Sequence, residues 1–446
     1  MFKTHVRMAF RHLRKQSVYS LLHVLGLSVA MACFIGGREL AASSPARPNS
    51  SSFQWKISSP AEQGLDSGKL AELVDLIREG QRYPRIQSLL VVRHGCLVVE
   101  EYFNNWNRER LHILQSVTKS FTSALIGIAI ARGDIKGVDE KILDFFPDMK
   151  DIAHMDERKA SIRLKDLLTM RSGVDYHENG QDSPHHRLNR TPTGWDKFYL
   201  DRPMAGEPGK NFNYDSGGVI LLSAILKSRT GMHADVYAEQ TLFKSLGIEK
   251  KFWVKNQEGH PHTGGGLALR TRDMARFGLL YLNKGKWEGE QVVPEDWIRE
   301  SFEMHVDFGN TGQDIVGYGY LWWIQRPDPQ GDGQQYIYAA RGAKGQYIFI
   351  VPEHDMVVAV NADTQSEEQK RRIFEFLYGY ILPAVHVKPQ PQRENIARKP
   401  VHDHGQEYEA VIQAFPAERM SREVFIDQTH GQQVVSVPAA RTAIKR

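Results

Sequence analysis

Cysteine is nearly absent from this sequence. Among 446 residues there are two, Cys33 and Cys96, and Cys33 falls within an apolar run. So few cysteines provide neither a disulfide framework nor a cysteine-based zinc site. The 18 histidines show no His-Glu-x-x-His or similar spacing, so we interpret His260 and His262 as loop residues and predict no metal or other cofactor.

An excess of charge is also missing from most of the chain. The formal net charge is +4, but five cations and no acid lie in residues 1–15, so the remainder carries about −1. A body with this balance is not expected to bind nucleic acid. The Gly264-Gly-Gly266 run lacks the Lys-Ser/Thr pair and the preceding strand of a phosphate-binding loop, so we interpret it as a backbone turn.

Only one long apolar run occurs. Residues 18–37 are twenty residues without a formal charge, enough for a helix across the roughly 30 Å hydrocarbon core. The basic segment 1–17 predicts a cytoplasmic amino terminus, with the remainder outside the membrane. A cleaved signal peptide is the alternative, because Ala41, Ala42 and Ser44 are small enough for a processing site.

This opening segment resembles the first transmembrane segment of bacterial ABC-type permeases over about 35 residues. No second span follows, so the chain is not itself a permease. The uncharged run behind five cations predicts a single-pass protein of the bacterial inner membrane whose folded part lies on the periplasmic side. The membrane is its predicted partner through this helix, and the permease-like anchor also hints at a membrane protein as partner, which the sequence does not identify.

The rest of the sequence divides by composition into three parts. Residues 38–54 are small, polar and proline-containing, which predicts a linker. Residues 55–385 carry the regular apolar patterns of a folded domain. Residues 386–446 are rich in Gln, Pro and charge without a sustained period, which predicts a mobile tail that the folded domain does not need.

The apolar periods predict one α+β domain whose sheet is built from both chain ends. Helical spacing covers residues 65–80, and two β-rich runs around His94-Gly95 predict a hairpin. A buried helix is expected over residues 115–132, followed by a helical middle to about residue 300. Later strands are expected at 318–325, 336–340, 346–351 and 356–361, with a closing helix at 367–382.

The segment Ser116-Val-Thr-Lys119 is the first candidate for chemistry. Residues three apart lie on one face of a helix, where a neutral lysine can take the proton of the serine hydroxyl. This is the only Ser-x-x-Lys match in the chain, and it opens an apolar helix. The alternative is a helix start in which Ser116 is a cap and Lys119 is solvated.

Two later segments are further candidates. Tyr214-Asp215-Ser216 follows a turn-rich stretch and precedes an apolar helix, which predicts a phenol at the edge of a cleft or, alternatively, a buried structural tyrosine. The small residues of Ala340-Arg341-Gly342-Ala343 run into a strand. Such residues let a ligand approach the backbone, where an N–H can hold an oxyanion, although a tight turn explains them equally well.

These three segments, in this order, resemble the serine β-lactamase and penicillin-binding-protein superfamily. The branch that holds class C β-lactamases, carboxylesterases and 6-aminohexanoate-dimer hydrolases is most similar. Leu164–Gly173, Gly264–Gly278 and Tyr318–Trp323 support the resemblance, which spans residues 60–385. It implies an α/β (α+β) fold in which an antiparallel sheet flanked by helices adjoins an all-helical region, with the site between them.

The resemblance also implies roles for single residues. Ser116 would be the acylated nucleophile, Lys119 its base and Tyr214 the residue that assists proton transfer. The N–H groups of Ser116 and Ala343 would form the oxyanion hole. The substrate-binding positions implied by the two later motifs are Ser216, Arg341 and Gly342.

Two positions depart from the family pattern. Ser216 stands where class C lactamases have Asn, which weakens a contact to an amide substrate. Ala340 stands where lactamases and transpeptidases have Lys or His, which removes a cation that meets the substrate carboxylate. Alternation along the strand predicts that the side chain of Arg341 turns away from the cleft.

The sequence therefore predicts a membrane-tethered serine hydrolase that cleaves small carboxylic esters or amides through an acyl-enzyme. One alternative is a β-lactamase or D,D-peptidase that acts on β-lactams or wall peptides. The other is a binding or sensor module that kept the fold without catalysis, although the presence of Ser116, Lys119 and Tyr214 together counts against it.

Overall fold

The structure is a computed structural model that describes residues 53–309, 314–326 and 335–385. The predicted basic segment 1–17, the membrane span 18–37 and the tail 386–446 lie outside the described residues, as does almost all of the linker 38–54. Within the described ranges, no helix combines the length and the apolar character that crossing a membrane requires.

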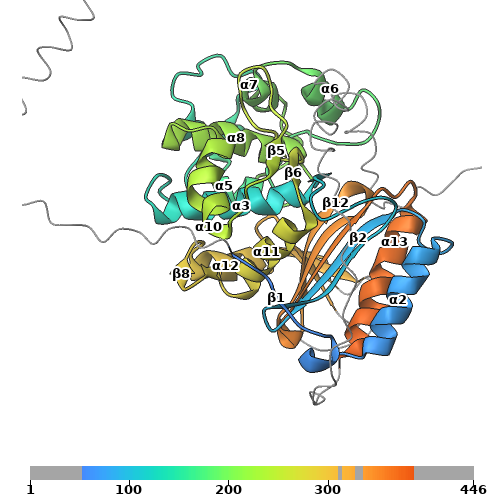
Figure 1. Cartoon of the computed structure of the whole chain (residues 1–446). Helices are drawn as coiled ribbons and strands as arrows, with labels where there is room; N and C mark the ends of the chain where they lie inside the picture. Colours follow the sequence, from blue (N-terminus) through green and yellow to red (C-terminus); the bar gives the residue numbers. More distant parts are fainter. Residues whose placement is uncertain (1–52, 310–313, 327–334, 386–446) are drawn as a thin grey trace, which may run out of the picture. The chain divides into compact units, whose positions relative to one another are not determined.

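The largest sheet in the part that the structure describes has nine strands, with helices on either side of it (Figure 1). Neighbouring strands are antiparallel except for the parallel pair of β1 and β3. Across the sheet the strands are β1 (Lys56–Ile57), β3 (Cys96–Tyr102), β2 (Ile86–Arg93), β14 (Met356–Ala362), β13 (Gln346–Val351), β12 (Ile337–Gly342), β11 (Trp323–Gln325), β10 (Ile315–Tyr318) and β9 (Val306–Asp307). The pairing of β2 with β14 confirms that both chain ends build the sheet.

Helices cover both faces of this sheet, which is why β13 and β14 are buried at every residue. On one face, Tyr347 and Phe349 of β13 contact the ring of Phe374 in α13 (Glu367–Glu375) at 5.3 and 5.8 Å. On this face α13 runs beside α2 (Ser67–Glu79) (Figure 1). On the other face, a Cβ on Gly278 of α11 (Thr271–Leu282) would lie 2.9 Å from Ile348, so this helix packs closely on the sheet.

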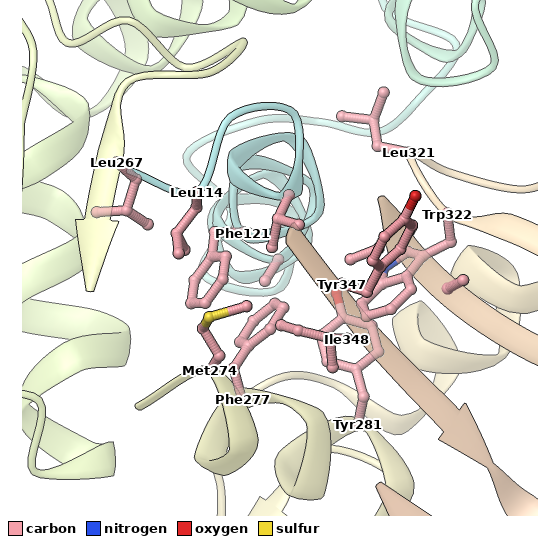
Figure 2. Packing of buried hydrophobic residues seen from close by; sticks show 14 of the residues in the cluster. Leu114, Phe121, Leu267, Met274, Phe277, Tyr281, Leu321, Trp322, Tyr347 and Ile348 are labelled. Carbon is pink, nitrogen blue, oxygen red and sulfur yellow. The ribbon is translucent and has the colours of Figure 1, made fainter. Parts of the chain in front are cut away.

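Helix α3 (Val117–Ala131) is buried almost all round, as its apolar sequence predicts. Figure 2 shows Phe121 of α3 against Phe277 of α11, and the two rings stack at 3.7 Å. A Cβ on Gly127 would lie 2.3 Å from the indole of Trp297 in α12 (Glu295–Phe302). Because α3 is enclosed in this way, side chains at its amino-terminal end are held in fixed positions.

The helical region expected after α3 is present. Its helices are α4 (Glu157–Ser161), α5 (Leu164–Leu168), α6 (Pro184–Arg190), α7 (Trp195–Leu200), α8 (Ser216–Thr230), α9 (Ala234–Ala238) and α10 (Lys244–Leu246). Short strands accompany it: β4 (His112–Ile113), β6 (Leu267–Leu269) and β5 (Lys251–Trp253) form one small sheet, and β7 (Lys286–Trp287) pairs with β8 (Glu290–Gln291). The predicted α+β architecture is therefore confirmed.

Two predicted elements differ from the structure. The single strand expected at 318–325 is a hairpin, because Leu321 has φ 62° in the left-handed region and reverses the chain between β10 and β11. A Cβ on Gly319 would lie 2.0 Å from the carbonyl oxygen of Ser301, so only glycine fits this turn. The closing helix is α-helical only through Glu375, and a π-helical turn, Phe376–Ile381, follows it.

Candidate active site

Ser116 lies at the junction between β4 and the first turn of α3. The left-handed backbone of Gln115, with φ 50°, turns the chain there. Ser116 occupies the helix N-cap position, but its hydroxyl does not cap the helix. Instead it accepts a hydrogen bond of 2.9 Å from Nζ of Lys119. The alternative of a capping serine beside a solvated lysine is wrong, since Lys119 is only 1% exposed.

Burial determines the acid–base behaviour of Lys119. Its Nζ also donates to the carbonyl oxygen of Gly264 at 2.6 Å, so the Gly264–Gly266 turn contributes a backbone acceptor to the site. Burial lowers the pKa of Lys119 to about 8, while the carboxylates of Glu178 and Asp215 act in the opposite direction. With that pKa, roughly a tenth of the lysine is neutral at pH 7, and the fraction rises with pH.

Tyr214 joins the same group. Burial raises the pKa of its phenol, and a hydrogen bond with Ser116 acts against that rise. Nζ of Lys119 lies 5.0 Å from the centre of the Tyr214 ring, and that ring stacks on Trp323 at 5.6 Å. The structure therefore brings together the three predicted catalytic side chains, and the phenol is protonated over the ordinary pH range.

The late strand also reaches this site. A Cβ on Gly342 would lie 2.5 Å from the carbonyl oxygen of Leu114, so the end of β12 packs on the segment that leads into Ser116. Strand β11 pairs with β12 only as far as Ala339. In the described residues, the following backbone through Gly342 pairs with β13 alone, so this end of β12 extends past β11 beside the segment that leads into Ser116.

Arg341 and Ala340 project from opposite faces of β12. Their cross-strand partners are Tyr347 and Ile348, whose side chains face α13 and α11 respectively. This confirms the predicted alternation. The Arg341 guanidinium lies 4.8 Å from the Phe374 ring and 5.6 Å from the Trp323 ring. Because Trp323 stacks on Tyr214, the guanidinium is one ring away from the site, which is closer than the sequence suggested.

The sequence analysis missed Glu178. This residue lies in the loop between α5 and α6, is 8% exposed, and its Oε1 accepts the backbone N–H of Ser216 at 2.9 Å. Burial raises the pKa of its carboxyl, with Lys119 acting against that rise. No spacing links Glu178 to the three motifs, so the sequence contains no local signal for it.

Of the two histidines interpreted as loop residues, His262 is buried beside the Gly264–Gly266 turn and His260 is half-buried. Nε2 of His262 is 3.0 Å from Oδ1 of Asn189, and the ring of His260 contacts that of His233 at 4.9 Å. Among the residues described, no group of three or more His, Cys, Asp or Glu side chains is arranged to hold a metal ion.

Comparison with known proteins finds relatives in sequence and in fold. The 6-aminohexanoate-dimer hydrolase of Paenarthrobacter ureafaciens is 23% identical over 67% of this chain and 78% of its own length. A solved structure of a hydrolase with promiscuous acyltransferase activity covers 70% of this chain and 99% of its own, at 17% identity and a TM-score of 0.60. The solved structure of the octameric penicillin-binding protein homologue from Pyrococcus abyssi covers 72% of this chain and 79% of its own, at 20% identity and a TM-score of 0.56.

The sequence profile of the Beta-lactamase family matches residues 73–377, more than half of the chain. Together with the β-lactamase-like fold and the serine–lysine pair at the start of α3, this match shows that the chain belongs to the Beta-lactamase family and is a serine hydrolase of that family.

Proposed function

We propose that this protein hydrolyses small carboxylic esters, and some amides, through an acyl-enzyme on Ser116. The neutral amine of Lys119 takes the Ser116 proton while the serine oxygen bonds to the carbonyl carbon. The N–H groups of Ser116 and Ala343 hold the oxyanion, and Tyr214 relays the proton from the Lys119 ammonium to the leaving group. Water then releases the acyl group. The observation that carries this proposal is the buried 2.9 Å contact between Lys119 and Ser116.

The preference for esters over β-lactams rests on the late strand. β-Lactams and wall peptides carry a carboxylate near the scissile bond, and Ala340 offers no charge to meet it. Arg341 is on the face of β12 opposite to Ala340, and its guanidinium packs against Phe374 and Trp323, one ring away from Tyr214. An ester alkoxide also leaves without the full protonation that an amine needs, so short esters require only the nucleophile, the relay and the oxyanion hole.

Aromatic side chains beside Tyr214 favour an aryl leaving group. Phe212 and Phe308 contact each other at 5.0 Å, and Phe212 contacts Trp323 at 6.0 Å. Both phenylalanines are half-buried and Trp323 stacks on Tyr214. Offset or edge-on contacts with such rings favour a flat aromatic group over an aliphatic one.

Two active-site probes separate this proposal from its alternatives. We expect a fluorophosphonate to label Ser116 in the purified protein and a labelled penicillin to react poorly. Rapid labelling by both probes would favour a β-lactamase or D,D-peptidase instead. Labelling by neither would favour a binding or sensor module. A Ser116→Ala protein is the control, since any label that it retains does not report the proposed nucleophile.

We further propose that residues 18–37 tether the protein to the bacterial inner membrane, with the hydrolase domain on the periplasmic side. The support is the uncharged run that follows five cations in the sequence. The full chain should then sediment with membranes and resist extraction by salt. A soluble mature protein that begins near residue 43 would show that the segment is a cleaved signal.

A further inference from the structure

One buried carboxylate in the site takes no part in the steps proposed above. Oε1 of Glu178 accepts the N–H of Ser216 at the start of α8, where the helix dipole favours a negative charge. Oε2 of Glu178 is buried and has no hydrogen-bond partner of normal geometry within the described ranges. The carboxylate is therefore held by the backbone N–H of Ser216, and the Ser216 hydroxyl also favours its ionised form.

The backbone connects this carboxylate to Lys119. The carbonyl oxygen of Ser216 lies 3.2 Å from the position of a Cβ on Gly264, and the carbonyl oxygen of Gly264 accepts Nζ of Lys119. Tyr214, two residues before Ser216, presents its ring to the same Nζ at 5.0 Å. Glu178, in the loop before α6, and Lys119, in α3, are thus connected through Ser216 and Gly264.

The other ionisable groups around Lys119 are either neutral or already paired. Burial lowers the pKa of His185 to about 3 and that of His262 well below its ordinary value, so both rings are neutral at working pH. Tyr214 is a protonated phenol. Asp215 is the second anion, but it accepts hydrogen bonds from three donors: the Tyr199 hydroxyl at 2.5 Å, the Ser172 hydroxyl at 3.2 Å and the Gly218 N–H at 2.9 Å.

The groups that face Glu178 itself are Lys119, Asp215, His186 and the phenols of Tyr176, Tyr214 and Tyr318. Lys119 and the contacts with Ser216 favour the ionised carboxylate, against the effect of burial. With fewer hydrogen bonds to neutralise it than Asp215, Glu178 is the anion that acts most strongly on the lysine.

We propose that Glu178 is the counter-charge of Lys119. When the Ser116 proton moves to Nζ, a neutral amine becomes a buried ammonium, and the Glu178 carboxylate stabilises that ammonium without itself gaining or losing a proton. Glu178 is thus a positioning residue that acts through Lys119 and does not touch the reacting atoms. The inference rests on the proposed function, because it requires Lys119 to be the base.

The sign of the expected effect follows from this charge. Replacing Glu178 by Gln removes an anion that favours protonated Lys119, so the lysine pKa falls further. The amine is then neutral at lower pH but is a weaker base. We expect the acid limb of the rate profile to move about one pH unit downward and the plateau rate to fall several-fold. A purely structural role would lower the rate without moving the limb.

The test is the rate at which a fluorophosphonate inactivates the full-length protein between pH 5 and 9.5, for wild type, Glu178→Gln and Glu178→Asp. Glu178→Asp withdraws the carboxylate by one methylene and should shift the limb downward by a smaller amount. Asp166→Asn is the matched control: Asp166 is also buried, but its carboxylate accepts the N–H of Arg163 and does not face Lys119. The acid limb of the rate profile of Asp166→Asn should stay at the wild-type pH.

The outcomes distinguish this inference from the proposed function. If the wild-type protein is not labelled at Ser116, the proposed function fails. If the wild type is labelled but the limb of Glu178→Gln stays in place or moves upward, the counter-charge role is overturned. Should Glu178→Gln not fold, the same two readings apply to Glu178→Asp.

Discussion

Among the residues that the structure describes, two lysines are buried to the same degree, and they differ in what they contact. Lys119 and Lys159 are each 1% exposed, and burial lowers the pKa of both. Nζ of Lys159 donates to the carbonyl oxygens of Ala153 and Leu200, at 2.6 and 2.8 Å. Nζ of Lys119 donates to one carbonyl and to the hydroxyl of Ser116.

This comparison shows which feature makes a buried lysine a candidate base. A lowered pKa follows from burial alone, so it occurs at both positions. Carbonyl oxygens have no proton to give, and Lys159 therefore holds a loop onto α7. A hydroxyl has one, so only Lys119 can take part in activating a nucleophile.

Removing the hydroxyl should have the largest effect. Ser116→Ala deletes the group that distinguishes the two lysine environments, so ester turnover should fall on the order of 10⁴-fold. The side chain is small and does not cap α3, so the thermal unfolding midpoint should change little. Steady-state kinetics and a melting curve on the same preparation check both parts. Turnover retained by this variant would exclude Ser116 as the nucleophile.

Replacing each lysine by methionine should separate chemistry from structure. Lys119→Met should lower kcat/KM by about a thousandfold, because the serine loses its base. Lys159→Met leaves two buried carbonyls without a donor and should lower the free energy of unfolding by about 2 kcal/mol. Its kcat/KM, per folded molecule, should stay within about threefold of wild type. A large loss of kcat/KM in fully folded Lys159→Met protein would contradict the distinction between the two lysines.

The difference in kcat/KM between substrate classes should be smaller than the loss caused by replacing Lys119. A missing charge-assisted hydrogen bond corresponds to about 1.5–3 kcal/mol, which is about ten- to a hundredfold in rate. We therefore expect kcat/KM for a short-chain aryl ester to exceed that for a cephalosporin by at least that factor, with linear amides between them or undetectable. Comparable cephalosporin turnover would contradict this, and its loss in Arg341→Ala would show that the arginine serves the site.

The pH profile should follow the titration of Lys119. The neutral amine is the active form, so kcat/KM should rise with pH, about tenfold per unit below the lysine pKa of about 8, and level off above it. A profile measured on a non-ionising ester between pH 5.5 and 9.5 checks this. A rate independent of pH across this range would mean that the lysine is not titrating in the rate-limiting step.

Removal of the tail should have the smallest effect. Residues 386–446 follow the closing helix and carry no apolar period, so a chain of residues 54–385 should fold and keep kcat/KM within about twofold of the full protein. Circular dichroism and ester kinetics on both chains make the comparison. Loss of the folded state in the shorter chain would show that the tail packs on the domain.

Local sequence patterns predicted much of the fold. The run that becomes α3 is apolar on nearly every face, and β2 and β3 flank a His-Gly turn, so period and turn chemistry agreed. The hairpin of β10 and β11 was missed because its turn depends on Leu321 in a left-handed conformation and on the contact of Gly319 with Ser301. Both are tertiary features that no local period encodes.

The candidate site also combines local contacts, which the sequence predicts, with contacts between distant segments, which it does not. Ser116 and Lys119 are three residues apart on one helix, so their contact is local and could be predicted. The carbonyl of Gly264 reaches Lys119, and Glu178 reaches Ser216, only because separate loops meet near the start of α3. The position of Arg341 relative to Trp323 likewise depends on the end of β11, which strand alternation alone does not specify.

The most direct test of the central claim is to trap the acyl-enzyme. The protein is mixed with a short-chain aryl ester, quenched in acid within milliseconds to seconds, digested and analysed by mass spectrometry. The account predicts that the mass of the acyl group appears on the peptide that contains Ser116, and that it is absent in Ser116→Ala. Full ester turnover with no acylated Ser116 peptide, or with the acyl group on another residue, would contradict it.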